Sequence, residues 1–389
     1  MPSTSSAWTP FKREYRRSPF ENYQEMALNG PLYKINNNSV MILSYEINER
    51  LFTCKDIIPF APNQIMKKQC PSFCRIISNW VFTMNGQKHT MARKFLMEHW
   101  DLNQLKSNVE EFTFELLKKN RNKKLNFIKD YSELVSAYTF LKYFNMNLNN
   151  AKKIISYVNK LKNVLEIFVS MKQYEKMEKA CINFKKLIIK ELDNGDSVFF
   201  NQLYDCLDDS NDREEIFASI LMLLFTTSIY TSAAQLTLSL NAILNSTTQK
   251  NFIVNNYKKC SKSIVQELIR FDSPVQIISR IATKDIEICN KVIKKDSYIL
   301  LNIGAANRDP EQFHNPNILN LNRAYKPNLS FGIGPHHCLG ASLAKFSLNS
   351  FIETSSELLP YIHLNKNSNL IWGNGIATRS LKKYSIVIN

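Results

Sequence analysis

The sequence predicts a mainly α-helical fold with a smaller β portion, on three observations. Proline is absent between residues 72 and 273, which permits long helices across that span. Residues 216–244 contain no charged residue in 29 positions, although eleven of them are Ser, Thr, Tyr, Gln or Asn. We therefore expect one long helix buried in protein there, rather than a transmembrane span. Strand-like stretches are short and lie near the two ends of the chain and after residue 271.

In chain order, residues 1–20 are expected to form an N-terminal arm, and 21–389 a single domain. A helix is predicted over 21–29, then strands at 32–35 and 39–44 that flank three asparagines in a hairpin, then a helix from 45 to 51. The span 57–79 holds three prolines and two cysteines without a clear period, so it is expected to be irregular.

Further helices are expected over 85–100, within 103–200 and over 261–270. Residues 271–288 indicate a turn followed by strands, since Pro274 does not fit a central strand. Residues 366–389 indicate strands around a turn at 373–375.

The charge and cysteine content narrow the class of protein. The chain has 50 Lys and Arg against 34 Asp and Glu, a net charge of +16, which favours an acidic partner. The spacing of zinc fingers is absent, so nucleic-acid binding is not favoured. The eight cysteines form no CxxC pair, and the start of the chain resembles neither a secretory signal nor a hydrophobic anchor. We therefore expect reduced thiols in a cytoplasmic protein that does not bind a membrane.

One loop has an unusual composition. Three of the nine glycines, Gly332, Gly334 and Gly340, fall within nine positions around Cys338. Glycine is used where the backbone bends unusually or approaches another group closely. Such a loop indicates either a thiolate held as a ligand or a buried free cysteine beside a turn, and the spacing alone does not decide between them.

The stretch FGIGPHHCLGASLA, 331–344, resembles the haem-binding loop of cytochromes P-450. The resemblance implies that Cys338 is the axial ligand of the iron of haem b and that other loop residues contact this cofactor. The positions that match the motif are Phe331, Gly332, Gly334, His336, Cys338 and Gly340.

Other segments match this family in order along the chain. His89 and Arg93 lie four apart on one predicted helix and resemble a pair that donates to one haem propionate, and Arg280 resembles the arginine at the other. Residues 305–313, AANRDPEQF, resemble the bacterial form of a conserved segment. The resemblance also implies a structural ion pair between Glu267 and Arg270, with Arg323 as third member.

The uncharged helix would carry the residues that activate oxygen. Aligned with the family motif, Thr231 matches the catalytic threonine and Ser232 its neighbour, while Ser228 replaces a glycine and Tyr230 replaces an acid. Tyr230 would either relay protons or only pack, and a register one residue earlier stays open. The expected substrate pocket is lined by Thr227, Ser228, Val275, Ile277 and Ile376, with a lid over roughly 145–180.

The resemblance implies a monomeric haem-thiolate monooxygenase or oxidase of specialised metabolism. A ferredoxin-type protein would supply electrons and dock near Lys345, because the chain has no flavin or iron–sulfur motif. Three alternatives remain: oxidative cross-linking of aromatic residues in a peptide or carrier-bound substrate, a non-catalytic haem-binding protein, and a nucleic-acid-binding protein without haem.

Overall fold

The structure is a computed structural model of the 389-residue chain. It describes residues 8–389 except 61–63, 195–196, 208–211 and 366–368. The described residues divide into two compact units. Unit 1 draws on Met1–Phe60, Thr237–Cys338 and Lys366–Tyr384, and unit 2 on Ala61–Leu236, Leu339–Asn365 and Ser385–Asn389.

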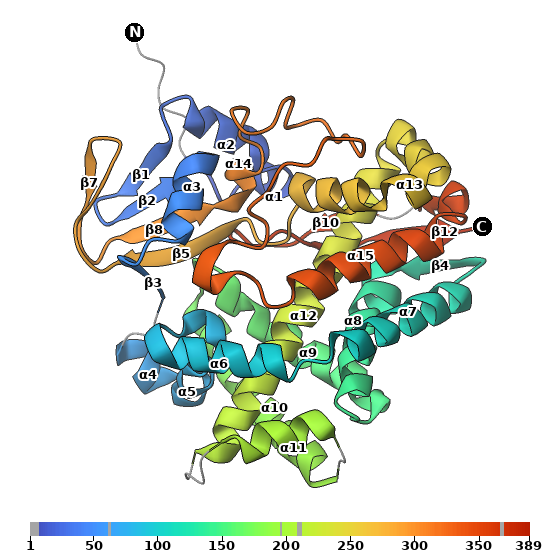
Figure 1. Cartoon of the computed structure of the whole chain (residues 1–389), viewed down its shortest axis with the longest axis horizontal. Helices are drawn as coiled ribbons and strands as arrows, with labels where there is room; N and C mark the ends of the chain where they lie inside the picture. Colours follow the sequence, from blue (N-terminus) through green and yellow to red (C-terminus); the bar gives the residue numbers. More distant parts are fainter. Residues whose placement is uncertain (1–7, 61–63, 195–196, 208–211, 366–368) are drawn as a thin grey trace. The chain divides into compact units, whose positions relative to one another are not determined.

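Unit 1 contains a five-stranded sheet in the order β1-β2-β8-β5-β3 (Figure 1). Only the β2–β8 pair is parallel, with Met41 opposite Leu300. The hairpin β1–β2 turns at the asparagines, as predicted. The strands are β1 (Leu32–Asn36), β2 (Ser39–Ile42), β3 (Ile57–Pro59), β5 (Ile277–Ala282) and β8 (Tyr298–Asn302), with two small pairs, β6 (Ile286–Ile288) with β7 (Lys291–Ile293) and β10 (Ile371–Trp372) with β11 (Leu381–Lys383).

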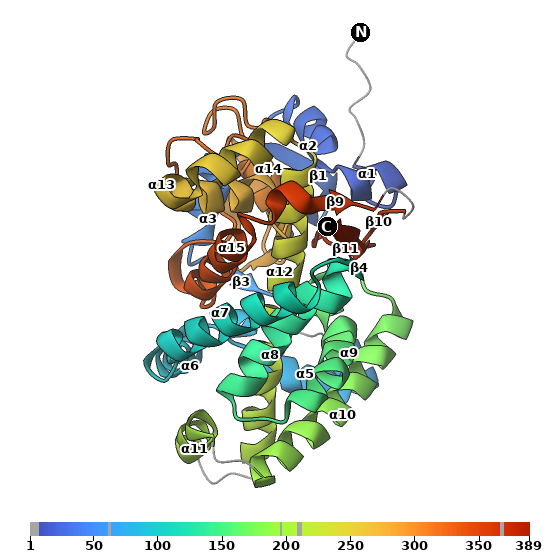
Figure 2. The ribbon, with the colours of Figure 1, turned by 90° about the vertical axis from the view of Figure 1, so that its right-hand side faces the viewer.

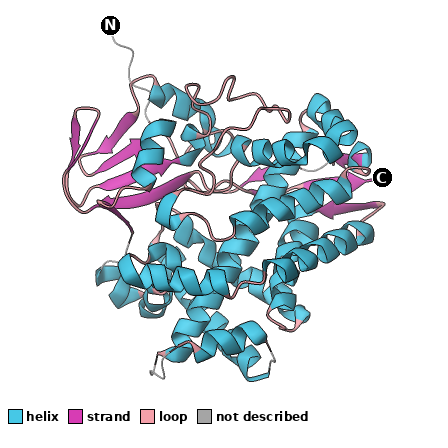
Figure 3. Cartoon of the chain, viewed as in Figure 1, coloured by secondary structure: helices cyan, strands magenta, loops and turns pink. Residues whose placement is uncertain are grey.

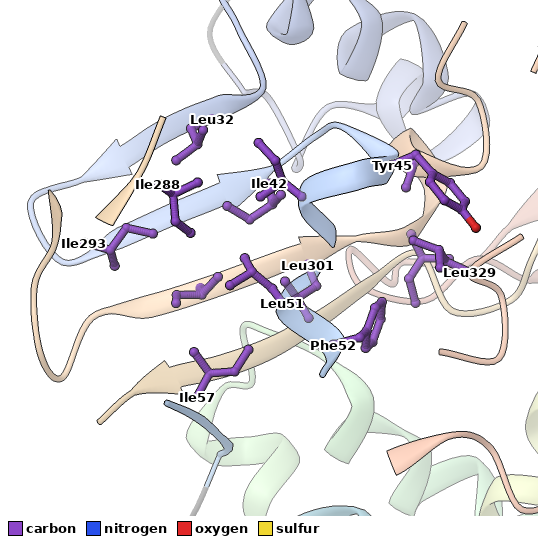
Figure 4. Packing of buried hydrophobic residues seen from close by; sticks show 14 of the residues in the cluster. Leu32, Ile42, Tyr45, Leu51, Phe52, Ile57, Ile288, Ile293, Leu301 and Leu329 are labelled. Atoms are coloured by element: carbon purple, nitrogen blue, oxygen red, sulfur yellow. The ribbon is translucent and has the colours of Figure 1, made fainter. Parts of the chain in front are cut away.

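The core of unit 1 packs aliphatic side chains of this sheet against helix α3 (Tyr45–Phe52) (Figure 4). Ser44 caps α3 by accepting the N–H of Ile47. The other helices of this unit are α1 (Arg13–Arg17), α2 (Phe20–Ala27), α13 (Thr247–Phe271) and α14 (Ile303–Ala306). Helix α1 lies inside the predicted arm, and its Tyr15 is buried and contacts Tyr23.

The described part of unit 2 is mainly helical (Figure 3). Its helices are α4 (Gln64–Gln69), α5 (Pro71–Ser78), α6 (Gly86–Glu98), α7 (Leu102–Lys119), α8 (Glu133–Tyr143), α9 (Ala151–Leu161), α10 (Met171–Asn194), α11 (Val198–Asp205) and α15 (Ala341–Ser355). Helices α9 and α10 pack side by side (Figure 2). A three-stranded sheet joins β4 (Lys123–Asn126), β12 (Ser385–Ile388) and β9 (Ile362–Leu364).

The prediction of an irregular segment over 57–79 was wrong. This stretch forms β3, α4 and α5. Pro71 stands at the first position of α5, where its missing N–H costs nothing, and the carboxylate of Glu178 accepts the N–H groups of Ser72 and Phe73. Strand β4 was also missed, because only helices were expected within 103–200.

The long uncharged helix was confirmed as α12 (Arg213–Leu244). By length and composition alone it could cross a membrane, but 72% of its most apolar window is buried inside the protein. Burial of this extent is typical of the core helix of a globular protein. Residues up to Leu236 belong to unit 2, and the remainder belong to unit 1.

Candidate functional site

The Cys338 loop lies in unit 1, and its backbone is left-handed at two glycines. Gly332 and Gly334 have φ of +62° and +74°, in the left-handed region that L side chains rarely adopt. A Cβ at Gly334 would also lie 3.2 Å from the carbonyl oxygen of Phe52. The Cys338 N–H donates to the Phe331 carbonyl at 2.9 Å, while Cys338 itself is exposed. The loop therefore holds its backbone inward and presents the thiol.

A buried ion cluster is connected to this loop through hydrogen bonds. Arg270 makes a bidentate pair with Glu267, at 2.7 and 2.8 Å, and Arg323 donates to the same carboxylate at 3.0 Å. Glu267 and Arg270 are each only 3% exposed. The three residues expected to form the ion pair thus lie in contact, and the two arginines share one carboxylate.

Sequence reasoning missed the residue that links this cluster to the loop. Arg270 also donates to the backbone carbonyl of Asn307, at 2.7 Å. The Asn307 side chain accepts the N–H of Leu329 and donates to the hydroxyl of Ser330, both at 2.8 Å. These two residues directly precede Phe331. Asn307 stands inside the matched segment AANRDPEQF, which was the available signal.

Arg280 is a desolvated cation in unit 1. It lies on β5, opposite Pro59 of β3 and Ile299 of β8. Burial lowers the pKa of its guanidinium to about 10. Its guanidinium donates to the carbonyl of Ser279 at 2.9 Å, and in the described part of the chain no carboxylate lies within ion-pair distance of it. A bound carboxylate would compensate this charge.

The expected pocket residues of unit 1 come from two adjacent segments. The N–H groups of Gln276 and Ile277 donate to the carbonyl of Ala377 at 2.8 and 3.2 Å, and Val275 forms a β-bridge with Thr378. The structure therefore brings Val275 and Ile277 beside the segment that contains Ile376, which is buried.

His89 and Arg93 lie one turn apart on α6, in unit 2. His89 is buried and Arg93 is half-buried. Burial, together with the positive charge of Arg93, lowers the pKa of the His89 imidazole. His89 is therefore neutral at pH 7, and Arg93 supplies the cationic charge of the pair.

One face of helix α12 is less buried than the rest of its central part. From Phe217 to Leu240 every residue is buried except four half-buried ones, Thr227, Ser228, Thr231 and Ser232. Their spacing of i, i+1, i+4 and i+5 places them on one face of the helix. We call this face the hydroxyl strip. The Thr231 hydroxyl donates to the carbonyl of Thr227, whose own hydroxyl donates to the carbonyl of Leu223 at 2.8 Å.

Tyr230 does not belong to the hydroxyl strip. It is buried, and the Nζ of Lys162 lies over its ring, 4.8 Å from the centroid. Of the two readings left open for Tyr230, this placement favours packing over proton relay. The helix turns Tyr230 about 100° away from Thr231, and a proton relay through Tyr230 stays a prediction. Lys162 itself was not anticipated from the sequence.

The remaining expected site residues are placed as follows. Phe331 and His336 are half-buried members of the Cys338 loop, and His336 ends a short 3₁₀ turn that begins at Gly334. Gly340 caps α15, where its carbonyl accepts the N–H of Ala344 at 2.8 Å.

This donor set fits haem b. A thiol exposed on a glycine-rich loop suits a soft iron ligand, and a desolvated arginine that pairs with no carboxylate of the described residues suits a propionate. Between Phe217 and Leu240, the hydroxyl strip is the part of α12 that protein atoms cover least. The thiol, the arginine and the hydroxyl strip are each described by contacts within a single unit.

The known proteins that this chain resembles are cytochromes P450. The family model "Cytochrome P450" matches residues 260–355. The "Biotin biosynthesis cytochrome P450" of Bacillus subtilis (strain 168) is 42% identical over 26% of this chain, a match that spans 25% of that relative's length. "Cytochrome P450 CYP107DY1" of Priestia megaterium is 25% identical, over 79% of this chain and 76% of the relative.

Solved structures show the same fold over nearly the whole chain. P450BioI, in complex with an acyl carrier protein ligated to hexadec-9Z-enoic acid, has a TM-score of 0.87 at 21% identity and covers 97% of this chain and 99% of its own. Epothilone D-bound cytochrome P450epoK has a TM-score of 0.88 at 17% identity, with 98% and 99% covered.

Proposed function

We propose that the chain is a haem b monooxygenase of the cytochrome P450 family and that it oxidises a biosynthetic substrate at an iron held by Cys338. The observation that carries this proposal is the Cys338 loop, with its two left-handed glycines and exposed thiol. When bound, the haem supplies oxygen activation driven by external electrons, and a thiolate ligand favours O–O cleavage.

The chain's own residues have distinct tasks in this proposal. Cys338 holds the iron, and the loop backbone keeps its sulfur in place through the Cys338–Phe331 hydrogen bond. Arg280 neutralises one propionate, and Arg93 with neutral His89 donates to the other. Phe331, His336 and Gly340 shape the loop against the cofactor.

Proton handling is assigned to the hydroxyl strip. Thr231 holds a proton at its Oγ1, and Ser232 supports it together with water. A hydroxyl donor without a carboxylate partner is a weaker acid near neutral pH than a hydroxyl–carboxylate pair. From Phe217 to Leu240, α12 has no Asp or Glu. We therefore expect modest coupling of electron supply to product, unless the substrate itself brings an acidic group.

The substrate is proposed to be a fatty-acyl or polyketide-like chain, free or held by a carrier protein. One structural neighbour is bound to an acyl carrier protein, and relatives are named for biotin and polyketide biosynthesis. Oxidative cross-linking of aromatic groups on a carrier-bound peptide is the second candidate. The net charge of +16 suits an acidic carrier and an acidic ferredoxin.

A turnover experiment separates these outcomes. The purified holoprotein is supplied with a surrogate ferredoxin, its reductase and NADPH, and offered free and carrier-bound acyl chains and aromatic peptides. Mass spectrometry of the products should show a gain of one oxygen on an acyl chain. A loss of two hydrogens from a peptide would instead establish cross-linking. Reduction without any product would establish a non-catalytic haem protein.

The electron donor is proposed to dock near Lys345 on α15, and the protein to act as a cytoplasmic monomer. Lys345→Glu should slow reduction by ferredoxin and reduce its dependence on salt, since a rim charge chiefly affects the association rate. Unchanged reduction kinetics would exclude this docking position.

A further inference from the structure

We propose that Lys162 is a positioning residue that fastens the segment between α9 and α10 to the central helix at Tyr230. The proposal rests on the proposed function in one respect, namely that this segment covers substrate. Lys162 begins a short 3₁₀ turn, Lys162–Leu165, directly after α9. The contact it makes joins this turn to α12 one residue before Thr231.

The contact is a cation–π interaction with a fixed cation. The Lys162 ammonium lies 4.8 Å from the centroid of the Tyr230 ring. It also donates to the side-chain oxygen of Asn159 at 3.1 Å. Both Lys162 and Asn159 are half-buried, and Tyr230 is buried, so the interaction is partly screened from water.

A second layer of contacts anchors Asn159. Its amide nitrogen donates to the carboxylate of Glu133, on α8, at 2.9 Å. Burial raises the pKa of the Glu133 carboxyl, while Lys162 and Lys129 act in the opposite direction. The chain of contacts therefore runs from α8 through α9 and the turn to α12, and it consists of Glu133, Asn159, Lys162 and Tyr230. We call it the lid chain.

The lid chain ends at Tyr230, within the span of α12 that carries the hydroxyl strip. Tyr230 and Thr231 are consecutive residues, and the Thr231 hydroxyl depends on the carbonyl of Thr227 one turn earlier. Release of the Tyr230 ring frees this turn of α12 to adjust. Opening of the segment after α9 is thereby coupled to the position of the Thr231 hydroxyl. The segment also exposes the apolar side chain of Phe168.

The residue type at position 230 explains why the coupling between the segment and α12 is weak. Tyr230 stands where the family resemblance expects an acid. A carboxylate there would form an ion pair with the same ammonium, whereas a tyrosine ring offers only a cation–π contact. Such a contact holds the segment closed for most of the time and still lets it open for a bulky or tethered substrate.

Hydrogen exchange of the holoprotein tests the proposal without turnover. Lys162→Met keeps the aliphatic stem and removes the charge, so amides in 162–170 and 227–232 should exchange about three- to tenfold faster, in line with the loss of a cation–π contact. Lys162→Arg should restore protection. Binding of imidazole, followed by its optical shift, should be faster in Lys162→Met and unchanged in Lys162→Arg.

The chain offers a matched control. Lys160 also lies over a tyrosine ring, 5.7 Å from the centroid of Tyr157, but both residues are on α9. Lys160→Met should leave exchange in both segments and imidazole binding as in the wild type. If Lys162→Met behaves like Lys160→Met, the proposal is overturned. A failure of the proposed oxidation chemistry would leave these exchange results standing, so the two proposals fail separately.

A second pair of variants tests whether the ring carries the contact. Tyr230→Phe keeps the ring and should retain wild-type protection, whereas Tyr230→Leu should resemble Lys162→Met. The double variant of Lys162→Met with Tyr230→Leu should show no further acceleration, because both changes remove one interaction. Fully additive effects, or loss of protection in Tyr230→Phe, would contradict coupling through the ring.

Discussion

At the residue scale, the buried charge of Arg280 indicates that this side chain binds an anionic group. It is a cation on the sheet of unit 1 whose pKa is lowered to about 10 by burial, and in the described residues no carboxylate pairs with it. A sequence pattern could suggest this arginine, because an alternating strand is readable. The pattern could not show that the charge is desolvated, since this depends on β3 and β8 on either side.

We predict that Arg280→Gln weakens haem binding without destabilising the haem-free protein. Hydrogen bonds to charged groups contribute about 1.5–3 kcal/mol, so transfer of haem to apomyoglobin should be about tenfold faster or more. The melting temperature of the haem-free variant should equal or exceed that of the wild type, because a desolvated charge is removed. The exposed Arg121→Gln is the control, and equal haem transfer in both variants would contradict the assignment.

Glu133 gives a prediction about pH. Burial raises its pKa above the ordinary value of 4.5, so above pH 4.5 the folded protein keeps a proton that the unfolded chain has lost. Its contribution to stability is therefore fully present below pH 4.5 and is lost as the pH rises through the raised pKa. Glu133→Gln removes this pH-dependent loss of stability, and its amide oxygen can still accept the hydrogen bond from Asn159.

The difference in melting temperature, Glu133→Gln minus wild type, should accordingly increase from pH 4.5 to pH 7. Thermal melts of both proteins at a series of pH values measure it directly. A flat difference, or one that decreases with pH, would mean that the neighbouring lysines outweigh burial.

At the scale of elements, the helices and strands that were predicted correctly are those encoded by a local sequence pattern. The uncharged run gave α12, and the asparagine triplet gave the β1–β2 hairpin. Helix α5 was missed because its first N–H groups are satisfied by Glu178, more than a hundred residues away. The Lys162–Tyr230 contact was missed for the same reason, since the local sequence does not place one residue beside the other.

The ion cluster behind the Cys338 loop joins elements rather than single residues. Glu267 and Arg270 lie on α13, Arg323 lies beyond α14, and Asn307 carries the connection to Leu329. Its value is to fix the loop backbone. The sequence motif predicted the ion cluster. It could not predict the hydrogen bonds of Asn307 that connect the cluster to the loop, because they form only in the folded chain.

We predict that Glu267→Gln destabilises the protein by about 3–5 kcal/mol, because it leaves two arginines without their shared carboxylate. Denaturant unfolding measures this loss. Asp285→Asn, which breaks the exposed pair with Lys294, should cost no more than about 1 kcal/mol. Comparable losses in the two variants would show that the cluster is not a buried network.

At the scale of the whole molecule, the sequence resembles one family, and the structure adds the burial and the contacts of each group. Five separated matches in the right order indicated a haem-thiolate fold, and solved structures with TM-scores of 0.87 and 0.88 share it. Unit 1 holds Cys338, Arg280 and the ion cluster, while unit 2 holds His89, Arg93 and the hydroxyl strip. The substrate was not readable because pocket and lid residues follow no local code. The division into one domain after an arm stays a prediction.

The central claim is that Cys338 is the thiolate ligand of the haem iron. The ferrous–CO spectrum of the purified holoprotein tests it most directly, with Cys338→His as the ligand variant and the exposed Cys289→Ser as the control. The wild type and the control should show the red-shifted band of a thiolate-ligated haem, and Cys338→His should show the band of a histidine-ligated haem. A histidine-type band in the wild type, or a thiolate band that persists in Cys338→His, would contradict the account.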